Sequence, residues 1–312
     1  MHVVIAGAGI AGLSAALYAR LYGFQTTVYE ELAPGGRCLE TSHARFFPGL
    51  PEDVGALDVA ERLEAQVRDR GAVFRNERVL QVRSNPGAPG DAGVIVTTEG
   101  GDLAADACII AVGDGRRTAG IPEEDTYAGR GLSYCATCDG PLFRGKEVCV
   151  IGGGDSACDE ALFLSRICST VHLLCRSPEL TALPALREEV SSCSTIQCHY
   201  STEVVGFRGM TNDMGFTTLQ AVRTRGADGE SDLPVSAAFV FAGRRGLSAS
   251  IAPDCTSDSD GRLATDARMR TSVTGVYAIG SARTNPVPQF VVAASDGVIA
   301  VRDMYERWHD KP

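Results

Sequence analysis

The stretch Val3-Val-Ile-Ala-Gly7-Ala-Gly9-Ile-Ala-Gly12 decides the fold, because it sets a glycine-rich turn directly after a short apolar run. Such a run is typical of a buried parallel strand. A helical stretch follows from Leu13 to Tyr22 and ends at a glycine, and a second apolar strand, about residues 26–29, ends in Glu30. The order strand, GxGxxG turn, helix, strand and acid is the fingerprint of a dinucleotide-binding unit.

Each position of this unit has a physical role. In the fingerprint, Gly7 allows the tight turn, Gly9 lets the backbone approach a pyrophosphate, and Gly12 lets the helix lie close to the strand. The N-terminus of the helix faces the phosphates. Glu30 stands about 20 residues further on, where its carboxylate accepts hydrogen bonds from a ribose diol. An ordinary glycine-rich turn without a ligand is the weaker explanation of the full pattern.

The same pattern returns 145 positions later along the chain. An apolar strand is expected at residues 148–151, a glycine-rich turn at 152–157, the continuing helix at 159–166 and a further strand at 170–174. The fingerprint allows a small residue at its third position, and the places of Gly7, Gly9 and Gly12 are taken by Gly152, Gly154 and Ala157. Two such units imply two nucleotides, or one nucleotide and a relic.

The second unit differs from the first at the position that selects the nucleotide. Cys175 and Arg176 stand where the first unit has Glu30 and Glu31. Without the acid, a ribose 2′-hydroxyl loses its acceptor, whereas a cation tolerates a 2′-phosphate, which favours NADP over NAD. A solvated surface arginine is an equally good explanation of Arg176.

A pair of cysteines lies between the two units, in Tyr134-Cys-Ala-Thr-Cys-Asp-Gly140. The Cys-x-x-Cys spacing brings the sulfurs of Cys135 and Cys138 within disulfide reach and can lower the pKa of one thiol. Asp139 beside a thiolate can hold and deliver a proton during exchange, and a role as a turn or cap residue is the alternative. A structural zinc site needs four ligands, and the other cysteines and the five scattered histidines offer no second pair, so no metal is expected.

The composition narrows the class of protein. With 312 residues, 44% of them apolar and 22% charged, the chain has enough apolar residues for about two domains. A net charge of −10 argues against nucleic-acid and anionic-membrane partners, because a phosphate-binding face needs more lysine and arginine. No apolar run approaches the roughly 20 residues of a membrane span. The first residues lack the features of a signal peptide, and the 11 cysteines then suggest a reducing compartment, the cytoplasm.

The chain resembles the low-molecular-weight, bacterial-type thioredoxin reductases nearly from end to end, most specifically in the motif Cys135-Ala-Thr-Cys-Asp-Gly140. The resemblance implies an α/β fold with two Rossmann-like dinucleotide-binding domains. An FAD-binding domain comprises residues 1–112 and 243–312, and it is split by an inserted NAD(P)-type domain, residues 113–242, that carries the cysteine pair. The resemblance further implies a homodimer, and an inserted domain that rotates about two glycine-containing joints.

The resemblance also assigns roles to site residues. Cys138 is expected to be the sulfur nearest the flavin, and Cys135 the sulfur that attacks the partner. Besides the first glycine turn and Glu30, the FAD-binding residues are expected to be Gly35 and Gly36, Gly280 and Ser281 at the end of a strand at 275–280, and Gln289 and Phe290 at the start of a helix that runs from Pro288 to about Trp308. Backbone N–H groups at the start of that helix can stabilise negative charge on a reduced flavin.

Three departures from the family pattern predict a divergent member. NADPH-using members carry a His-Arg-Arg cluster and a further arginine where this chain has Cys175-Arg-Ser-Pro-Glu-Leu-Thr181 and keeps one cation. A Gly-Asp pair at the flavin becomes Gly280-Ser281, and an Arg-Gln pair becomes Pro288-Gln289.

The main hypothesis is an FAD-dependent disulfide oxidoreductase. Electrons pass from a donor to FAD, then to the Cys135–Cys138 disulfide, and then to thioredoxin or a similar protein disulfide. NADPH is one candidate donor, bound at the second glycine turn and Arg176, and ferredoxin is another. The alternative enzyme is a dithiol oxidase that passes electrons from a small dithiol to oxygen. A flavin-bound redox sensor without turnover is the hypothesis that the complete cysteine motif favours least.

Overall fold

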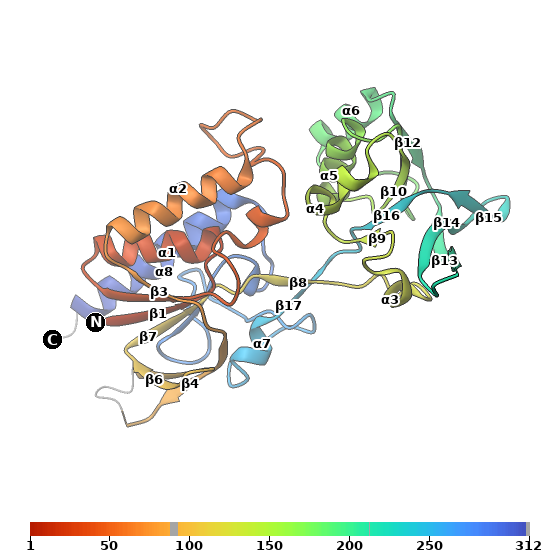
Figure 1. Ribbon diagram of the computed structural model, residues 1–312. Helices are drawn as coiled ribbons and strands as arrows, with labels where there is room; N and C mark the ends of the chain where they lie inside the picture. The colour runs from red at the N-terminus through yellow and green to blue at the C-terminus, as the bar shows by residue number, and fades with distance from the viewer. Residues whose placement is uncertain (88–92, 212, 310–312) are drawn as a thin grey trace. The chain divides into compact units, whose positions relative to one another are not determined.

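The computed structural model describes residues 1–87, 93–211 and 213–309. The chain folds into two compact units (Figure 1). Unit 1 comprises Met1–Gly115 and Arg244–Pro312, and unit 2 comprises Arg116–Gly243. The chain leaves unit 1 through β8 (Asp114–Arg116) and returns through β17 (Arg244–Gly246), and these two strands pair with each other.

Unit 1 is built around a parallel sheet with the strand order β18-β7-β1-β2-β3. Its strands are β1 (His2–Ala6), β2 (Gln25–Tyr29), β3 (Val73–Arg75), β7 (Ala107–Ile110) and β18 (Val276–Ala278). The helices are α1 (Ile10–Leu21), α2 (Ala56–Asp69), α7 (Ser248–Ile251) and α8 (Phe290–His309), with short 3₁₀ turns η1 (Gly36–Leu39) and η4 (Gly280–Ala282). A second, antiparallel sheet consists of β4 (Val79–Asn85), β5 (Gly93–Thr98) and β6 (Gly101–Ala105).

The parallel sheet that contains β1 is the middle one of three layers, with helices α1 and α8 on one face and the antiparallel sheet on the other. Successive side chains of a strand point to opposite faces of its sheet. Val3 and Ile5 are buried in the cluster that contains the apolar residues of α1 and α8. Val4 and Ala6 are buried on the other face, with the valines of β4 and β5. Because both faces are covered, β1 is apolar throughout, as buried parallel strands are.

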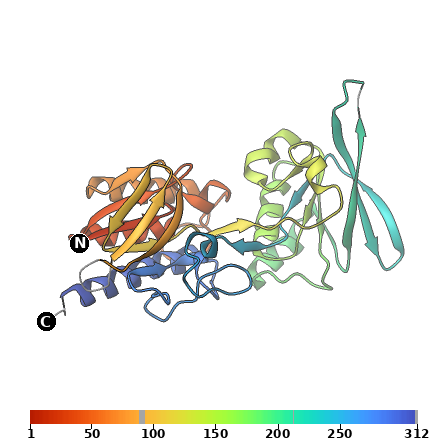
Figure 2. The same cartoon turned by 90° about the horizontal axis from the view of Figure 1, so that it is seen from below.

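Unit 2 repeats this arrangement of layers. Its parallel sheet has the order β12-β11-β10-β16-β9, formed by β9 (Leu132–Ser133), β10 (Glu147–Ile151), β11 (Thr170–Leu174), β12 (Ile196–His199) and β16 (Ala237–Val240). The helices are α3 (Glu124–Tyr127), α4 (Ala136–Asp139), α5 (Asp155–Ser165) and α6 (Pro184–Ser192), with a 3₁₀ turn η3 (Gly140–Phe143). An antiparallel sheet of β13 (Glu203–Thr211), β14 (Thr217–Gly226) and β15 (Gly229–Pro234) buries Phe207 and Val222 against the parallel sheet, and Figure 2 shows its long hairpin.

The two units match at the offset found in the sequence. A shift of 145 residues carries β1 and β2 onto β10 and β11, and it carries Ile10, the start of α1, onto Asp155, the start of α5. The strand register repeats as well, because His2 pairs with Gln25 and Glu147 pairs with Thr170. The predicted α/β architecture and the internal repeat are therefore confirmed. Among the described residues, no helix combines the length and the apolar character that crossing a membrane requires.

Element boundaries differ from the predictions at the glycine turns. The helix predicted from Leu13 begins at Ile10, because the carbonyl of Gly9 already accepts the N–H of Leu13 at 2.9 Å. The strand predicted at 275–280 ends at Ala278, and Gly280 then turns the chain with a φ of 61°. The last helix begins at Phe290 rather than Pro288, since the first helical hydrogen bond runs from the N–H of Ala293 to the carbonyl of Gln289 at 3.0 Å.

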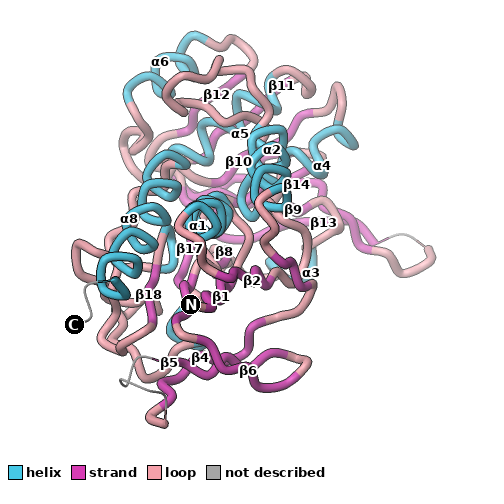
Figure 3. Tube along the Cα trace, turned by 90° about the vertical axis from the view of Figure 1, so that its left-hand side faces the viewer, coloured by secondary structure: helices cyan, strands magenta, loops and turns pink. Residues whose placement is uncertain are grey.

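Helices α1 and α8 lie side by side in unit 1 (Figure 3), and Gly297 of α8 lies against the backbone of α1. A Cβ at Gly297 would lie 2.7 Å from the backbone nitrogen of Ala15 and 2.8 Å from the carbonyl oxygen of Ala11. Both atoms belong to the backbone of α1 and cannot rotate away. The absence of a side chain at this position therefore sets the distance between the two helices.

We expect Gly297→Ala to lower the free energy of unfolding by about 1–3 kcal/mol, the usual cost of overpacking. This loss occurs although alanine has the higher helix propensity, by about 1 kcal/mol. Urea unfolding followed by fluorescence and circular dichroism measures the change. Ser295→Ala, at an exposed position of the same helix, is the control and should leave stability nearly unchanged. A Gly297→Ala protein at least as stable as the parent would contradict the close approach.

Candidate functional site

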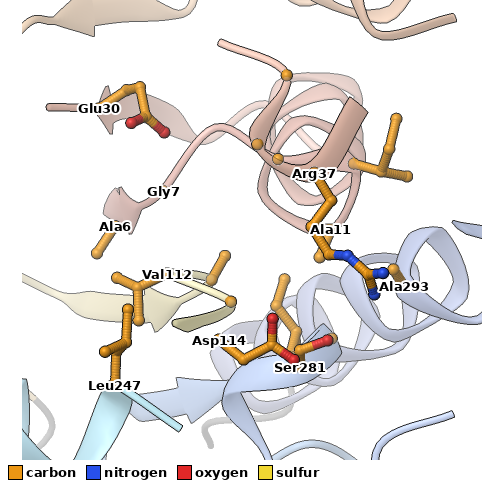
Figure 4. A pocket seen from close by; sticks show the side chains of 18 of the residues that line it. Ala6, Gly7, Ala11, Glu30, Arg37, Val112, Asp114, Leu247, Ser281 and Ala293 are labelled. Atoms are coloured by element: carbon orange, nitrogen blue, oxygen red, sulfur yellow. The ribbon is translucent and has the colours of Figure 1, made fainter. Parts of the chain in front are cut away.

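A cavity of about 370 Å³ opens in unit 1 at the carboxyl ends of β1, β7 and β18 (Figure 4). This edge of a parallel sheet is where nucleotides bind in doubly wound folds. Nine of the ten residues expected to bind FAD lie on its wall, and they come from every predicted segment: Gly7, Gly9, Glu30, Gly35, Gly36, Gly280, Ser281, Gln289 and Phe290. The tenth, Gly12, lies behind the wall. A Cβ there would stand 1.9 Å from the carbonyl oxygen of Gly7.

The glycines of the first turn separate into two kinds. Gly7 has a φ of +104°, and a Cβ there would lie 2.5 Å from the carbonyl oxygen of Ala111, so the protein itself demands glycine. Gly9 is different, because it has an ordinary φ of −73° and the nearest atom to its Cβ position is Gly36 Cα at 3.8 Å. The protein leaves room for a side chain at Gly9, and this room faces the cavity. A phosphate that approaches the bare backbone explains the glycine.

Glu30 is held in place at one end of the cavity. Its Oε2 atom accepts the N–H of Ala8 at 2.8 Å, and its Oε1 atom accepts the N–H of Leu32 at 3.2 Å. Each carboxylate oxygen can accept two hydrogen bonds, so both retain capacity for a ribose hydroxyl. In Figure 4 the carboxylate lies on the far side of the Gly7 turn from Ser281.

The opposite wall of the cavity depends on a residue that the sequence did not single out. Asp296 of α8 is buried, and its Oδ2 accepts the N–H of Gly280 at 2.9 Å and the Nε–H of Arg283 at 2.7 Å. The carboxylate therefore fixes η4 and presents Gly280 and Ser281 to the cavity. Asp296 lies six residues after the start of α8 and 16 residues after Gly280, so no local sequence pattern indicated it.

Charged residues that the sequence analysis also missed line the same side. They are Arg37, Glu40, Asp114 and Arg244. Arg244 forms an ion pair with Asp114 and lies 3.4 Å from Glu40. Since Asp114 and Arg244 are the first residues of β8 and β17, their ion pair also joins the two strands through which the chain leaves and re-enters unit 1.

In unit 2, Cys135 and Cys138 form a disulfide, and the two sulfurs differ in their surroundings. Cys135 is buried, whereas Cys138 is exposed. The N–H of Cys138 donates to the sulfur of Cys135 at 3.2 Å, and the hydroxyl of Thr137 lies 3.3 Å from the same sulfur. Donors of this kind stabilise a thiolate, so Cys135 is the better leaving group when the disulfide opens.

Asp139 is linked to this pair through Ser133, which the sequence analysis did not single out. The Ser133 hydroxyl donates to Asp139 Oδ2 at 2.6 Å and accepts the N–H of Cys135 at 3.0 Å. The carboxylate of Asp139 is thereby positioned beside the cysteine turn, within the same short segment. The sequence could have indicated Ser133 only through its position two residues before Cys135.

The second glycine turn has the same two kinds of glycine as the first. A Cβ at Gly152 would lie 2.7 Å from the carbonyl oxygen of Phe241, whereas the nearest atom to a Cβ at Gly154 is Thr181 Oγ1 at 3.8 Å. Gly154 has a φ of −91°, so the fold leaves room for a side chain there, as it does at Gly9. Ala157 stands where the first unit has Gly12, and its Cβ would lie 3.0 Å from a Cβ at Gly152.

The segment after β11 lies against the second glycine turn. Cys175 follows the strand directly and is buried against Gly153, and the next residue, Arg176, is exposed. Thr181 donates its N–H and its hydroxyl to the carbonyl of Gly153, at 2.8 and 3.2 Å. The segment therefore folds back onto the glycine turn and presents Arg176 at its edge.

Most of the free cysteines are buried, as small apolar side chains are. Seven of the nine are buried: Cys38, Cys108, Cys149, Cys158, Cys168, Cys175 and Cys255. Burial raises the pKa of the Cys38 thiol to about 12, which leaves it protonated and unreactive. Cys108, Cys149 and Cys175 lie buried in or beside strands, where a thiol acts as a small apolar side chain.

Comparisons with known proteins agree with this site. The family model described as pyridine nucleotide-disulphide oxidoreductase matches residues 1–297. A thioredoxin reductase of Treponema pallidum is 38% identical over 96% of this chain and 94% of its own length, and one of Streptomyces coelicolor is 33% identical over 97% and 92%. The solved structure of a Lactococcus lactis thioredoxin reductase superposes with a TM-score of 0.91 at 28% identity, covering 98% of both chains, and that of T. acidophilum gives 0.91 at 27%, covering 99% and 98%.

The chain therefore belongs to the pyridine nucleotide-disulphide oxidoreductases, and it is a flavin disulfide oxidoreductase. Within this class it is a member of the low-molecular-weight thioredoxin reductase family, so the family expected from the cysteine motif is confirmed.

The two kinds of glycine make opposite predictions for two alanine variants. Gly9→Ala should leave the stability of the flavin-free protein nearly unchanged, because the new Cβ has room, and should weaken flavin-nucleotide binding at least about tenfold, because the methyl group keeps the phosphate away. Gly12→Ala should lower the free energy of unfolding by about 1–3 kcal/mol, because its Cβ meets the Gly7 carbonyl. Urea unfolding and titration of the apoprotein with FAD separate the two effects. Equal loss of stability in both variants would contradict the assignment.

Proposed function

We propose that this chain binds FAD in the cavity of unit 1 and transfers electrons through the Cys135–Cys138 disulfide to the disulfide of thioredoxin or of a similar small redox protein. The main support for the proposal is the Cys135–Cys138 disulfide. Its buried sulfur, that of Cys135, accepts the N–H of Cys138, which would stabilise it as a leaving thiolate. The names of the relatives, which are thioredoxin reductases, support the choice of substrate.

The cavity residues fit FAD in order along the molecule. Glu30 would hold the ribose of the adenosine half, and the bare backbone at Gly9 would accept the pyrophosphate. Gly280, Ser281 and the first turn of α8 would then face the flavin half. When bound, FAD supplies a carrier that accepts and releases electrons in pairs. Unit 1 is thus the proposed FAD-binding domain and unit 2 the proposed NAD(P)-type domain.

Thiol–disulfide exchange follows from the two sulfur environments. Two electrons delivered at the exposed sulfur of Cys138 break the S–S bond and release Cys135 as a thiolate, which the N–H of Cys138 stabilises. Cys135 then attacks one sulfur of the partner disulfide and expels the other as a thiolate. Cys138 attacks the sulfur of Cys135 in the mixed disulfide and re-forms the Cys135–Cys138 bond. The partner leaves with two thiols after its thiolates take up two protons from solvent, which Asp139, held by Ser133, passes on one at a time.

These roles predict which cysteine variant captures the partner. Reduced Cys138→Ser, mixed with oxidised thioredoxin, should accumulate a one-to-one mixed disulfide, because Cys135 can attack and Cys138 is missing for the second step. Cys135→Ser should give little of this product. Non-reducing electrophoresis and intact mass detect the adduct, and the double variant is the blank. Capture by Cys135→Ser alone would reverse the proposed roles.

For the electron donor, we propose NADPH bound at the second glycine turn. The bare backbone at Gly154 supports a dinucleotide there, and Arg176 at the edge of the site supports a 2′-phosphate. This assignment uses Gly152, Gly154, Ala157 and Arg176 as the binding residues.

An anaerobic titration tests the donor. NADPH should bleach the flavin absorbance at about 450 nm in the purified protein. Arg176→Gln should raise the NADPH concentration required by about tenfold or more, because a charge-assisted contact to phosphate is lost, and should leave the response to NADH unchanged. Arg208→Gln removes an exposed arginine elsewhere in unit 2 and is the control. Reduction by dithionite but by neither nucleotide would refute NADPH as the donor.

One observation favours a second candidate, an enzyme independent of pyridine nucleotides. In the segment after Arg176, the hydroxyl of Thr181 donates to the carbonyl of Gly153, and the carboxylate of Glu179 lies 3.6 Å from Arg187. Within residues 175–181, Arg176 would therefore be the single cation that meets a 2′-phosphate. In that case the donor is ferredoxin, or a small dithiol supplies the electrons and oxygen accepts them. Hydrogen peroxide formed from a dithiol in air identifies the dithiol oxidase. The homodimer and the cytoplasmic location stay predictions from the resemblance and the composition.

A further inference from the structure

A cationic side chain lies on the cavity wall on the side away from Glu30. Arg37 belongs to η1, directly after Gly35 and Gly36, and lines the cavity. In Figure 4 its side chain points away from Glu30 and toward Ala293 in the first turn of α8, a residue that lines the cavity as well. The glycine turn stands between Glu30 and Arg37 along the cavity.

The order of the site residues tells which half of a dinucleotide Arg37 meets. An acid at the end of the second strand binds the ribose of the adenosine half, and the glycine turn binds the pyrophosphate. The other half of the dinucleotide must then lie beyond the glycine turn, on the side of Ser281 and Ala293. Arg37 is on this side. Under the proposed function, on which this inference rests, that half is the flavin.

Arg37 belongs to a group of opposite charges on this side of the cavity. The two acids on this side of the cavity interact with Arg37 and with other cations as well: Asp114 pairs with Arg244 and lies 3.7 Å from Arg262, and Glu40 lies 3.4 Å from Arg244. Burial and the like charge of Arg244 lower the pKa of Arg37, against the opposing effect of Asp114 and Glu40. The cationic form of Arg37 is thus less favoured than in water, and a negative charge placed in the cavity would relieve this cost.

We propose that Arg37 stabilises the negative charge of the reduced flavin and so raises the reduction potential of the bound FAD. Two electrons and one proton convert oxidised flavin into its anionic reduced form, which carries one more negative charge than the oxidised form. Arg37 interacts more strongly with the reduced form than with the oxidised form. The consequence is a flavin that is easier to reduce, and Arg37 thereby sets the driving force toward the Cys135–Cys138 disulfide.

The reduction potential of the FAD-loaded protein tests this proposal. Slow anaerobic reduction in the presence of a reference dye gives the ratio of reduced to oxidised flavin at a known potential. Arg37→Gln should lower this ratio about tenfold at a fixed potential, a shift of about 30 mV to more negative values for a two-electron couple. Arg37→Lys, which retains the charge, should recover most of the ratio. Arg302→Gln removes an exposed arginine from α8, outside the cavity, and should have no effect.

A second readout needs no electron transfer. Sulfite adds to the oxidised flavin ring and leaves a negative charge on it, so the dissociation constant of sulfite should rise about tenfold in Arg37→Gln and stay near the parent value in Arg37→Lys. The affinity of the apoprotein for oxidised FAD should change less than either quantity.

Three outcomes would overturn the proposal. If Arg37→Gln folds, binds FAD and keeps the potential and the sulfite affinity of the parent, Arg37 does not act on the flavin ring. If FAD affinity falls while the potential is unchanged, Arg37 binds the phosphates of the cofactor. If the parent protein takes up no FAD, both this proposal and the proposed function fail. If the protein binds FAD but does not reduce thioredoxin, only the proposed partner is refuted, and the same measurements still test the role of Arg37.

Discussion

The contact of Gly12 with the carbonyl of Gly7 closes the turn between β1 and α1 so tightly that no side chain fits between them. The tight turn brings the N-terminus of α1 over the end of β1, and it leaves the backbone at Gly9 bare toward the cavity. The remaining walls are then arranged around this fixed point. Glu30 reaches back to the N–H of Ala8 within the turn, and the pairing of Gly9 with Gly35 holds the next loop against it.

Unit 2 has the same tight glycine turn between a strand and a helix, but different residues around it. Its turn accommodates Ala157 in place of Gly12, and β11 is followed by Cys175 and Arg176 where β2 of unit 1 is followed by acids. The redox pair stands between β9 and β10 of this unit, on a short helical turn whose backbone donates to the inner sulfur. The repeat thus gives the chain two units of the dinucleotide-binding type. The cysteine turn that precedes β10 in the second unit provides the disulfide through which we propose that electrons leave the flavin.

The parts of this structure that depend on local constraints could be predicted from the sequence. The glycine turns, the strands beside them and the cysteine pair are each written within about ten residues, because turn geometry and strand burial demand particular residue types at fixed spacing. Asp296, Arg37 and the Asp114–Arg244 pair could not be predicted in this way. Asp114 and Arg244 are 130 positions apart and meet because unit 2 is inserted between them. The carboxylate of Asp296 gains its role from the path of a turn 16 positions earlier in the chain. The different exposure of Cys135 and Cys138 likewise depends on tertiary packing, although the motif itself predicted the pair.

The central claim is that flavin and disulfide form one electron pathway in this chain, and an anaerobic reductive titration tests it most directly. Dithionite is added to the FAD-loaded protein while the flavin absorbance and the free thiols are followed. We predict an uptake of about four electrons per chain, two for the flavin and two for Cys135–Cys138, with two new thiols, and about two electrons in the Cys135→Ser/Cys138→Ser double variant. Uptake of about two electrons by both proteins, with no new thiols, would show that the disulfide receives no electrons from the flavin and would contradict the account.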